Sequence, residues 1–202
     1  MVLYSFRKSS FLLSTAFILT HVAATPHGIP APNTSRKPSW TWPIMFRKSR
    51  VTYLNLSTLE YPKEICTKEY AVKWNHSARA FIKKAVVIFS SWKSEVEDVV
   101  YKPRRVRGPA RTFTALNSSG YLIYTIHFNY TSKYCAIIRK ENHTKEDDSG
   151  ACELWVNHNF FEAGPVIQNY CTENFKKYCK QYNATRFDIK DCFDTSKPIL
   201  FG

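Results

Sequence analysis

The sequence predicts an all-β fold, an eight-stranded antiparallel barrel or sandwich that is followed by one helix. Between residues 51 and 157, short runs rich in Val, Ile, Tyr, Phe and Thr are separated by Pro, Gly, Asn-Ser and charged turns. Many short strands at this spacing are typical of antiparallel barrels and sandwiches. In residues 166–182, apolar side chains instead recur every three to four positions, which predicts a helix.

The length and composition favour one compact domain. The chain has 202 residues, of which 44% are hydrophobic and 15% aromatic, and this content excludes a disordered chain. It holds only 6 Gly and has no fixed-period pattern, which argues against solenoids, propellers and collagen. A packed core is therefore expected.

Two of the predicted strands carry glycosylation sequons that assign their faces. A glycan must point outward, so Asn129 places the alternate residues of 121–130 inside, and Asn55 does the same for 50–56. The inward side chains either fill a solid core or line an apolar pocket; they are Leu122, Tyr124, Ile126, Phe128, Thr52, Leu54 and Leu56. The eight strands are expected at residues 50–56, 65–74, 80–90, 95–101, 111–116, 121–130, 134–139 and 151–156.

The first 24 residues have the features of a secretory signal peptide. Arg7 and Lys8 precede an apolar stretch at 11–20, and small residues follow up to Ala24. Cleavage there leaves a Pro-rich, extended lead-in over 25–49. No later run approaches the roughly 20 apolar residues of a membrane span, so we expect a secreted, extracellular protein without membrane insertion. Behind a signal peptide, sequons mark surface glycosylation positions, here Asn33, Asn55, Asn75, Asn117, Asn129, Asn142 and Asn183.

Six cysteines follow the signal peptide, and an oxidising compartment favours three disulfides with fifteen formal connectivities. Cys171 and Cys179 lie on one face of the predicted helix, about 12 Å apart along its axis. If the two strands before the helix form a hairpin, Cys135 and Cys152 are offset by about 16 Å. One helix on that hairpin is thus compatible with the pairs Cys135–Cys171 and Cys152–Cys179, which leaves Cys66 with Cys192.

The C-terminal third carries the most specific pattern. YCAII at 134–138 and, after a charged turn, CELWV at 152–156 are followed by Cys171 and by DIKDC at 188–192. This pattern resembles the salivary lipocalins of ticks, the family that includes the histamine-binding proteins. The resemblance covers residues 50–193.

The resemblance implies a lipocalin barrel of eight antiparallel strands over 50–193, a C-terminal helix stapled by disulfides, and a tail over 194–202. It supports the disulfides Cys66–Cys192 and Cys135–Cys171. The third pair, Cys152–Cys179, looks like the extra bond found in some members of the family.

The resemblance also implies a ligand site. The family's biogenic-amine signature has a Cys-Asp start, Glu-Leu-Trp or Glu-Leu-Tyr, and a later Cys, which Cys135, 153–155 and Cys171 match. The sequence departs at Ala136, where the family has Asp, and the strand at 121–130, where amine binders place a carboxylate, has none. A buried ammonium needs carboxylates to offset its desolvation. Glu153 alone can either hold an amine or serve as a structural hydrogen-bond partner. We expect it as the polar anchor of a pocket lined by Trp155, Tyr124, Phe128, Leu122, Ile126, Leu54 and Leu56.

A stoichiometric scavenger is the function that the resemblance implies. It would sequester a small host mediator in saliva and so suppress inflammatory and immune defence, with a lipid mediator or sterol favoured and a biogenic amine such as histamine or serotonin as the competing class. The alternative is an immunomodulator that acts through its surface on a host protein or immune cell, such as complement or dendritic cells. No HExxH, GxSxG, CxxC or glycine-rich phosphate loop occurs, so we expect neither an enzyme nor a cofactor or metal.

The formal charge of +13 draws the protein toward anionic surfaces such as sulfated glycans, or only keeps it soluble. Residues 102–111 concentrate basic side chains, either as a solvated loop or as a patch for an anionic glycan. Arg104 and Arg107 also have the spacing of a protease processing site. We expect a monomer, and no nucleic acid partner outside the cell.

Overall fold

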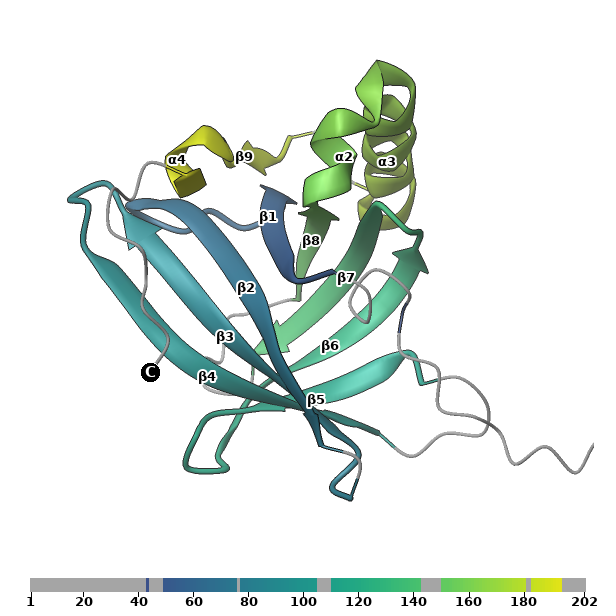
Figure 1. Ribbon diagram of the computed structural model, residues 1–202. Helices are drawn as coiled ribbons and strands as arrows, with labels where there is room; N and C mark the ends of the chain where they lie inside the picture. The colour runs from purple at the N-terminus through teal and green to yellow at the C-terminus, as the bar shows by residue number, and fades with distance from the viewer. Residues whose placement is uncertain are drawn as a thin grey trace, which may run out of the picture. The chain divides into compact units, whose positions relative to one another are not determined.

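A closed barrel of eight antiparallel strands forms the body of the protein, as seen in the computed structural model (Figure 1). The structure describes Pro43 and residues 49–75, 77–104, 110–142, 150–180 and 183–193. The predicted signal peptide, most of the lead-in with Asn33, the basic residues at 105–109 and the tail at 194–202 lie outside these residues. The strands are β1 (Val51–Ser57), β2 (Glu64–Asn75), β3 (Ala80–Phe89), β4 (Ser94–Pro103), β5 (Thr112–Leu116), β6 (Leu122–Thr131), β7 (Cys135–Asn142) and β8 (Ala151–Asn157).

Strand β1 closes the barrel. It pairs along its length with β8, and its first residues also pair with β2. A short strand, β9 (Thr185–Arg186), adds to the second half of β1. All other pairs join strands that are consecutive in sequence, so the barrel is of the up-and-down type. The prediction of eight strands is confirmed, and their ends lie within a few residues of the expected positions.

Alternate connections of an up-and-down barrel lie at the same end. The connections at 58–63, 90–93 and 117–121 therefore share one end, which we call the mouth. Trp92 and Tyr121, both exposed, stand on two of these connections. Three carboxylates of the inward face lie near the mouth, as described below.

Two apolar clusters lie on opposite sides of the barrel wall. The lumen cluster fills the inside and includes Phe81, Val99, Tyr101, Phe113, Phe128 and Trp155. The outer cluster covers the outside beneath the helices and includes Cys135, Ile137, Leu154, Phe160 and Phe175. Strands with apolar side chains on both faces, such as β8, therefore have a core on each side.

Three helices follow β8: α2 (His158–Glu162), α3 (Gly164–Cys179) and α4 (Lys190–Phe193). The helix predicted at 166–182 corresponds to α3, which begins with Pro165 in its first turn and ends at Lys180 in the left-handed conformation, φ 53°. It packs on β7 and β8 through Cys171 and Phe175. The segments α2, β9 and α4 were not predicted, because each is too short to give a periodic pattern.

Three disulfides join the barrel to the helices that follow it. They are Cys66–Cys192, Cys135–Cys171 and Cys152–Cys179. These are the expected pairs. The first fixes α4 against β2, and the other two hold α3 on the hairpin of β7 and β8.

A β-bulge in β1 changes which side chains face inward. Leu54 pairs with Trp155, but Leu56 pairs with Leu154, because the intervening Asn55 is an extra residue in the ladder. Leu54 therefore lies in the lumen cluster and Leu56 in the outer cluster. The prediction that Leu56 lines the inside is therefore wrong. Asn55 lies on the outside as expected, beside Phe160 and Phe187, but it is only 9% exposed.

Candidate functional site

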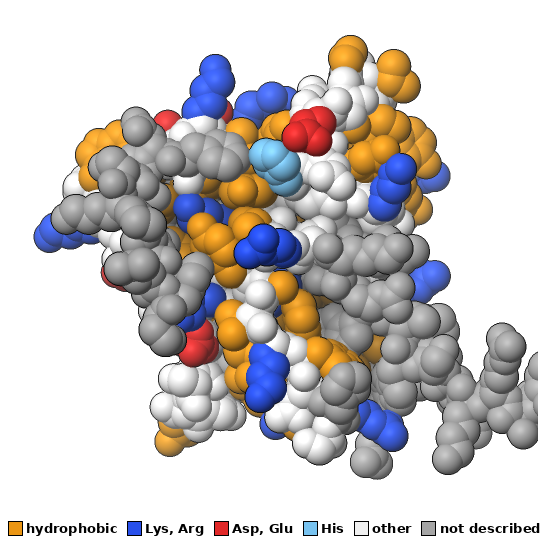
Figure 2. Space-filling view, viewed as in Figure 1, with side chains coloured by type: hydrophobic (Ala, Val, Ile, Leu, Met, Phe, Trp, Pro, Cys, Tyr) orange, Lys and Arg blue, Asp and Glu red, His pale blue; other side chains and the backbone are white. Residues whose placement is uncertain are grey.

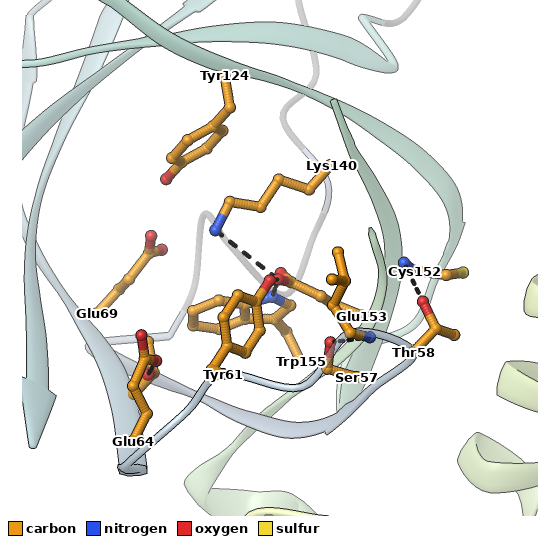
Figure 3. Close-up of polar contacts among 12 residues, drawn as sticks. Ser57, Thr58, Tyr61, Glu64, Glu69, Tyr124, Lys140, Cys152, Glu153 and Trp155 are labelled. Atoms are coloured by element: carbon orange, nitrogen blue, oxygen red, sulfur yellow. Dashed lines mark hydrogen bonds and ion pairs between the residues drawn. The ribbon is translucent and has the colours of Figure 1, made fainter. Parts of the chain in front are cut away.

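A buried carboxylate on β8, Glu153, lies inside the barrel. Its residue is 1% exposed, and alternation along β8 directs Glu153 and Trp155 into the lumen while Leu154 faces the outer cluster. The carboxylate accepts hydrogen bonds from the Tyr61 hydroxyl at 2.5 Å and from Trp155 Nε1 at 2.8 Å (Figure 3). Burial and the nearby carboxylate raise the pKa of Tyr61, so its hydroxyl keeps its proton and remains a donor.

A second buried carboxylate, Glu69, enters the lumen from β2. Lys83 Nζ donates a hydrogen bond to Glu69 Oε2 at 2.9 Å, and the Tyr101 hydroxyl donates to Oε1 at 2.5 Å. Lys83 Nζ also donates to the Thr52 hydroxyl at 3.2 Å. Burial lowers the pKa of Lys83, and the carboxylate opposes that effect. Glu69 and Lys83 thus form a buried ion pair.

A lysine from β7, Lys140, points into the space between these groups (Figure 3). Its Nζ lies 3.8 Å from Glu153 Oε1, which is an ion-pair distance but too long for a hydrogen bond. The same atom lies 4.5 Å from the centre of the Tyr124 ring and 5.6 Å from that of Tyr61, both within cation–π range. The Lys140 side chain is 26% exposed, so it reaches solvent.

Three further carboxylates lie on the inward face near the mouth. On β4, Glu95 and Glu97 are exposed and alternate onto the same face as Val99 and Tyr101, which belong to the lumen cluster. On β2, Glu64 accepts a hydrogen bond from the Thr67 hydroxyl at 3.1 Å. Burial raises the pKa of Glu64, and its neighbours Glu153 and Glu95 add to the rise.

The inward face is therefore acidic within a basic protein. Among the described residues, five carboxylates face two lysines there; they are Glu64, Glu69, Glu95, Glu97 and Glu153 against Lys83 and Lys140. The whole chain carries a formal charge of +13, and basic side chains outnumber acidic ones on the face of the molecule in Figure 2. A cleft lined by one sign of charge concentrates small ions of the opposite sign.

The cavity between these groups is small. It is lined by Glu69, Tyr101, Tyr124, Ile126, Ile138, Lys140, Glu153 and Trp155, and its volume is about 10 Å³. This volume holds about one water, whereas pockets for drug-sized ligands measure roughly 300–1,000 Å³. A ligand can enter only if a side chain moves, and Lys140 is the most exposed of the charged groups that line the cavity.

Comparison with known proteins decides the family. The sequence model of the tick histamine binding protein family matches residues 58–194. The chain belongs to this family. The fold agrees with that assignment, since Japanin from Rhipicephalus appendiculatus bound to cholesterol is a structural match with a TM-score of 0.50 at 12% identity, over 74% of this chain and 99% of that one.

A second structural match is the siderocalin Ex-FABP, described as functioning through dual ligand specificities. It has a TM-score of 0.47 at 12% identity, over 68% of this chain and 87% of that one. No curated protein sequence matches the chain. The family match and the fold together identify the chain as a lipocalin-type ligand-binding protein.

The predicted site residues of this lipocalin fall into three groups. Glu153, Trp155, Tyr124 and Ile126 line the cavity, and Leu54 and Phe128 lie in the lumen cluster around it. Leu122 is 40% exposed at the start of β6, and Leu56 is in the outer cluster, so neither contacts the cavity. Ala136, which stands where the family pattern has Asp, is fully buried in the lumen cluster.

Sequence reasoning missed most of the charged groups in the lumen. Of the five inward carboxylates, only Glu153 was predicted, and neither Lys83 nor Lys140 was. Alternation along residues 95–101 could have found Glu95 and Glu97, because they share a face with Val99 and Tyr101. The lumen therefore holds more carboxylates than Glu153, which is the one that the family pattern places there.

Neither a metal-binding cluster nor a membrane-spanning helix occurs among the described residues. There, no group of three or more His, Cys, Asp and Glu side chains has an arrangement that holds a metal ion. No described helix is both long and apolar enough to cross a membrane.

Proposed function

We propose that this lipocalin is a stoichiometric scavenger that binds a small cationic amine at the acidic end of its lumen. The observation that carries the proposal is the excess of carboxylates on the inward face, five against two lysines among the described residues. Sequence reasoning favoured a lipid because a second acid was missing. The carboxylates near the mouth, Glu64, Glu95 and Glu97, answer that objection, whereas Glu69 is already paired with Lys83.

The geometry supplies the contacts that an ammonium needs when it leaves water. Glu153 offers a buried carboxylate whose orientation is fixed by Tyr61 and Trp155. The rings of Tyr61 and Tyr124 already accept a cation on their faces, in contacts worth about 0.5–2 kcal/mol each. The carboxylate offsets the free-energy cost of removing the ammonium from water, and the contacts with the two rings add to this stabilisation.

Size favours a small ligand. An amine of histamine or serotonin size is much smaller than a sterol, so fewer lumen side chains must move to admit it to the cavity of about 10 Å³. Those side chains are large and well packed, with Phe113 and Phe128 ring centres 5.6 Å apart. Rearranging several of them costs more than moving one lysine.

The biological setting belongs to the same proposal. The secretory signal predicted at residues 1–24 and the three disulfides suit an extracellular protein. One protein molecule would remove one host mediator from solution, without turnover. In tick saliva, abundance and affinity together would then blunt the host's inflammatory response.

Calorimetric titration with histamine and with serotonin tests the function. The wild-type protein should bind at least one of them at one site per chain, and Glu153→Gln should weaken that binding by about 100-fold or more, since a buried ammonium loses its carboxylate. Glu173→Gln, on the exposed face of α3, is the matched control and should bind as the wild type does. Equal affinity of Glu153→Gln and the wild type would place the ligand elsewhere, and no binding of either amine would overturn the proposal.

A second candidate ligand is an apolar mediator with a carboxylate head, such as a fatty acid. The specific observation in its favour is Lys140, whose ammonium makes no hydrogen bond among the described contacts and faces the cavity. Native mass spectrometry of the secreted, deglycosylated protein separates the two classes. A co-purified lipid of defined mass would favour this candidate, whereas an empty protein that gains the mass of one amine supports the first.

A further inference from the structure

The two lysines of the lumen are held very differently. Lys83 is 1% exposed, and its ammonium donates hydrogen bonds to Glu69 at 2.9 Å and to Thr52 at 3.2 Å. Lys140 is 26% exposed, and its ammonium approaches Glu153 only to 3.8 Å. Lys83 is therefore part of a fixed buried pair, while Lys140 is a long side chain with one loose ion pair and access to solvent.

The Lys140 ammonium contacts the same groups that the proposed function assigns to the ammonium of a bound amine. It faces the Glu153 carboxylate and the rings of Tyr124 and Tyr61, and it lines the cavity of about 10 Å³ (Figure 3). A ligand ammonium cannot share this position, because two cations would meet in a poorly solvated space. One of them must leave.

The Lys140 side chain can move out of the cavity toward solvent. The aliphatic part of a lysine side chain can lie along an apolar surface while its ammonium stays in water. Lys140 already reaches solvent. Its charge acts on Glu64, since Lys140 lowers the pKa of that carboxyl against the upward effect of burial. A movement from Glu153 toward Glu64 and the mouth keeps the lysine beside a carboxylate.

We propose that Lys140 is a resident ammonium that occupies the amine position and thereby sets the ligand specificity of the lumen. A cationic ligand must displace it, so it reduces amine affinity, while a carboxylate ligand gains it as a partner. In the free protein it also neutralises Glu153, which would otherwise be a buried carboxylate without a cation. The inference rests on the proposed amine site and adds the residue that controls it.

Three variants test the inference by calorimetric titration with histamine and with oleate. Lys140→Met keeps an unbranched side chain that is one atom shorter and removes its charge, and Lys140→Arg keeps the charge. Lys73→Met is the control for net charge, because Lys73 is an exposed residue of β2 whose partner across the ladder is Ile82. Thermal unfolding and far-ultraviolet circular dichroism establish that each variant is folded.

Lys140→Met should bind histamine about tenfold more tightly than the wild type, a change typical of one partly buried charge contact. The same variant should lose any affinity for oleate. Lys140→Arg and Lys73→Met should stay close to the wild type for histamine. A lysine that only stabilises the fold would not raise the affinity for histamine and lower the affinity for oleate when its charge is removed.

The outcomes separate the inference from the function. If the wild type binds histamine and Lys140→Met binds it equally or more weakly, Lys140 does not occupy the amine position, although the amine function stands. If only Lys140→Met binds histamine, the resident ammonium is confirmed and the wild type is not a histamine scavenger. If neither protein binds histamine, and the wild type does not bind serotonin in the test of the proposed function, both proposals are overturned.

Discussion

Lys83 Nζ lies 2.9 Å from Glu69 Oε2 inside the barrel, and the two side chains are only 1% and 4% exposed. Such a pair is costly to form, because both charges leave water, and costlier to break, because the remaining charge has no partner. Glu69 also accepts a hydrogen bond from Tyr101, which in turn is 2.7 Å from the Tyr124 hydroxyl. The pair therefore anchors a polar network that spans β2, β3, β4 and β6.

Removing one charge of this pair should strongly destabilise the folded protein. Glu69→Gln leaves the Lys83 ammonium without its carboxylate and should lower the free energy of unfolding by about 3–5 kcal/mol. The double variant Glu69→Leu with Lys83→Met removes both charges and should lose less. Denaturant unfolding of the disulfide-intact protein measures both values. A loss below about 1 kcal/mol for Glu69→Gln would mean that the lysine is not confined as the structure places it.

Alkaline pH should destabilise the protein through three lumen tyrosines. Burial, together with nearby carboxylates, raises the pKa of Tyr61, Tyr101 and Tyr124 above 10.0. Above pH 10 the unfolded chain loses these protons and the folded chain keeps them. Their contribution to stability is therefore complete below pH 10 and declines as the pH rises toward the folded-state values.

Denaturant unfolding from about pH 8 to about pH 12, with ultraviolet titration of the tyrosines, measures this effect. Lys83 acts in the opposite direction, because its pKa is lowered in the folded state and the unfolded chain binds more protons there. In the Lys83→Met variant that opposing contribution disappears, so the fall in stability should be steeper. Titration of all tyrosines near pH 10 in the folded protein would contradict the prediction.

The carboxyl of Glu64 should cost stability at neutral pH. Burial raises its pKa from 4.5, so the folded state disfavours the charged form. The contribution of this group is present below pH 4.5 and is lost as the pH rises through the folded-state value. Glu64→Gln should therefore stabilise the protein at pH 7 by less than about 1 kcal/mol, since the group is half-exposed, and the gain should vanish in acid.

The same variant connects stability to binding. If Glu64 is retained for its charge near the mouth, Glu64→Gln should bind histamine more weakly while it unfolds less readily. Glu173→Gln removes a carboxylate from the exposed face of α3 and should change neither property. A Glu64→Gln protein that is both less stable and equally competent in binding would show a structural role for this residue.

The fold was predictable because its main signals are local. Strand composition and turn residues placed eight strands, and the helical spacing of Cys171 and Cys179 gave a disulfide pairing that the structure contains. The family signature placed Glu153 and Trp155, which meet in the lumen. These features depend on the order of residues and not on the tertiary packing.

The remaining site residues were not predictable from periodicity. Strand β2 alternates between Glu69, which faces the lumen, and Lys68, whose ammonium donates to the Cys192 carbonyl on the outside at 2.7 Å. Both residues are charged and both are buried, so their pattern carries no sign of which face is inside. The bulge at Asn55 reverses the inward face within β1 and leaves no trace in the composition of the strand.

Glycosylation should discriminate between the sequons at Asn55 and Asn183. Asn55 is 9% exposed in the bulge of β1, and its carbonyl accepts a hydrogen bond from the Phe187 amide at 3.0 Å, which holds the residues after β9 against β1. A glycan there conflicts with this packing, whereas Asn183 is exposed. Enzymatic deglycosylation with isotope labelling and peptide mass spectrometry should find Asn183 converted to Asp and Asn55 unchanged. The Asn183→Gln protein should lose the mass of one glycan and Asn55→Gln none; an occupied Asn55 would mean that β9 does not pack on β1 in the secreted protein.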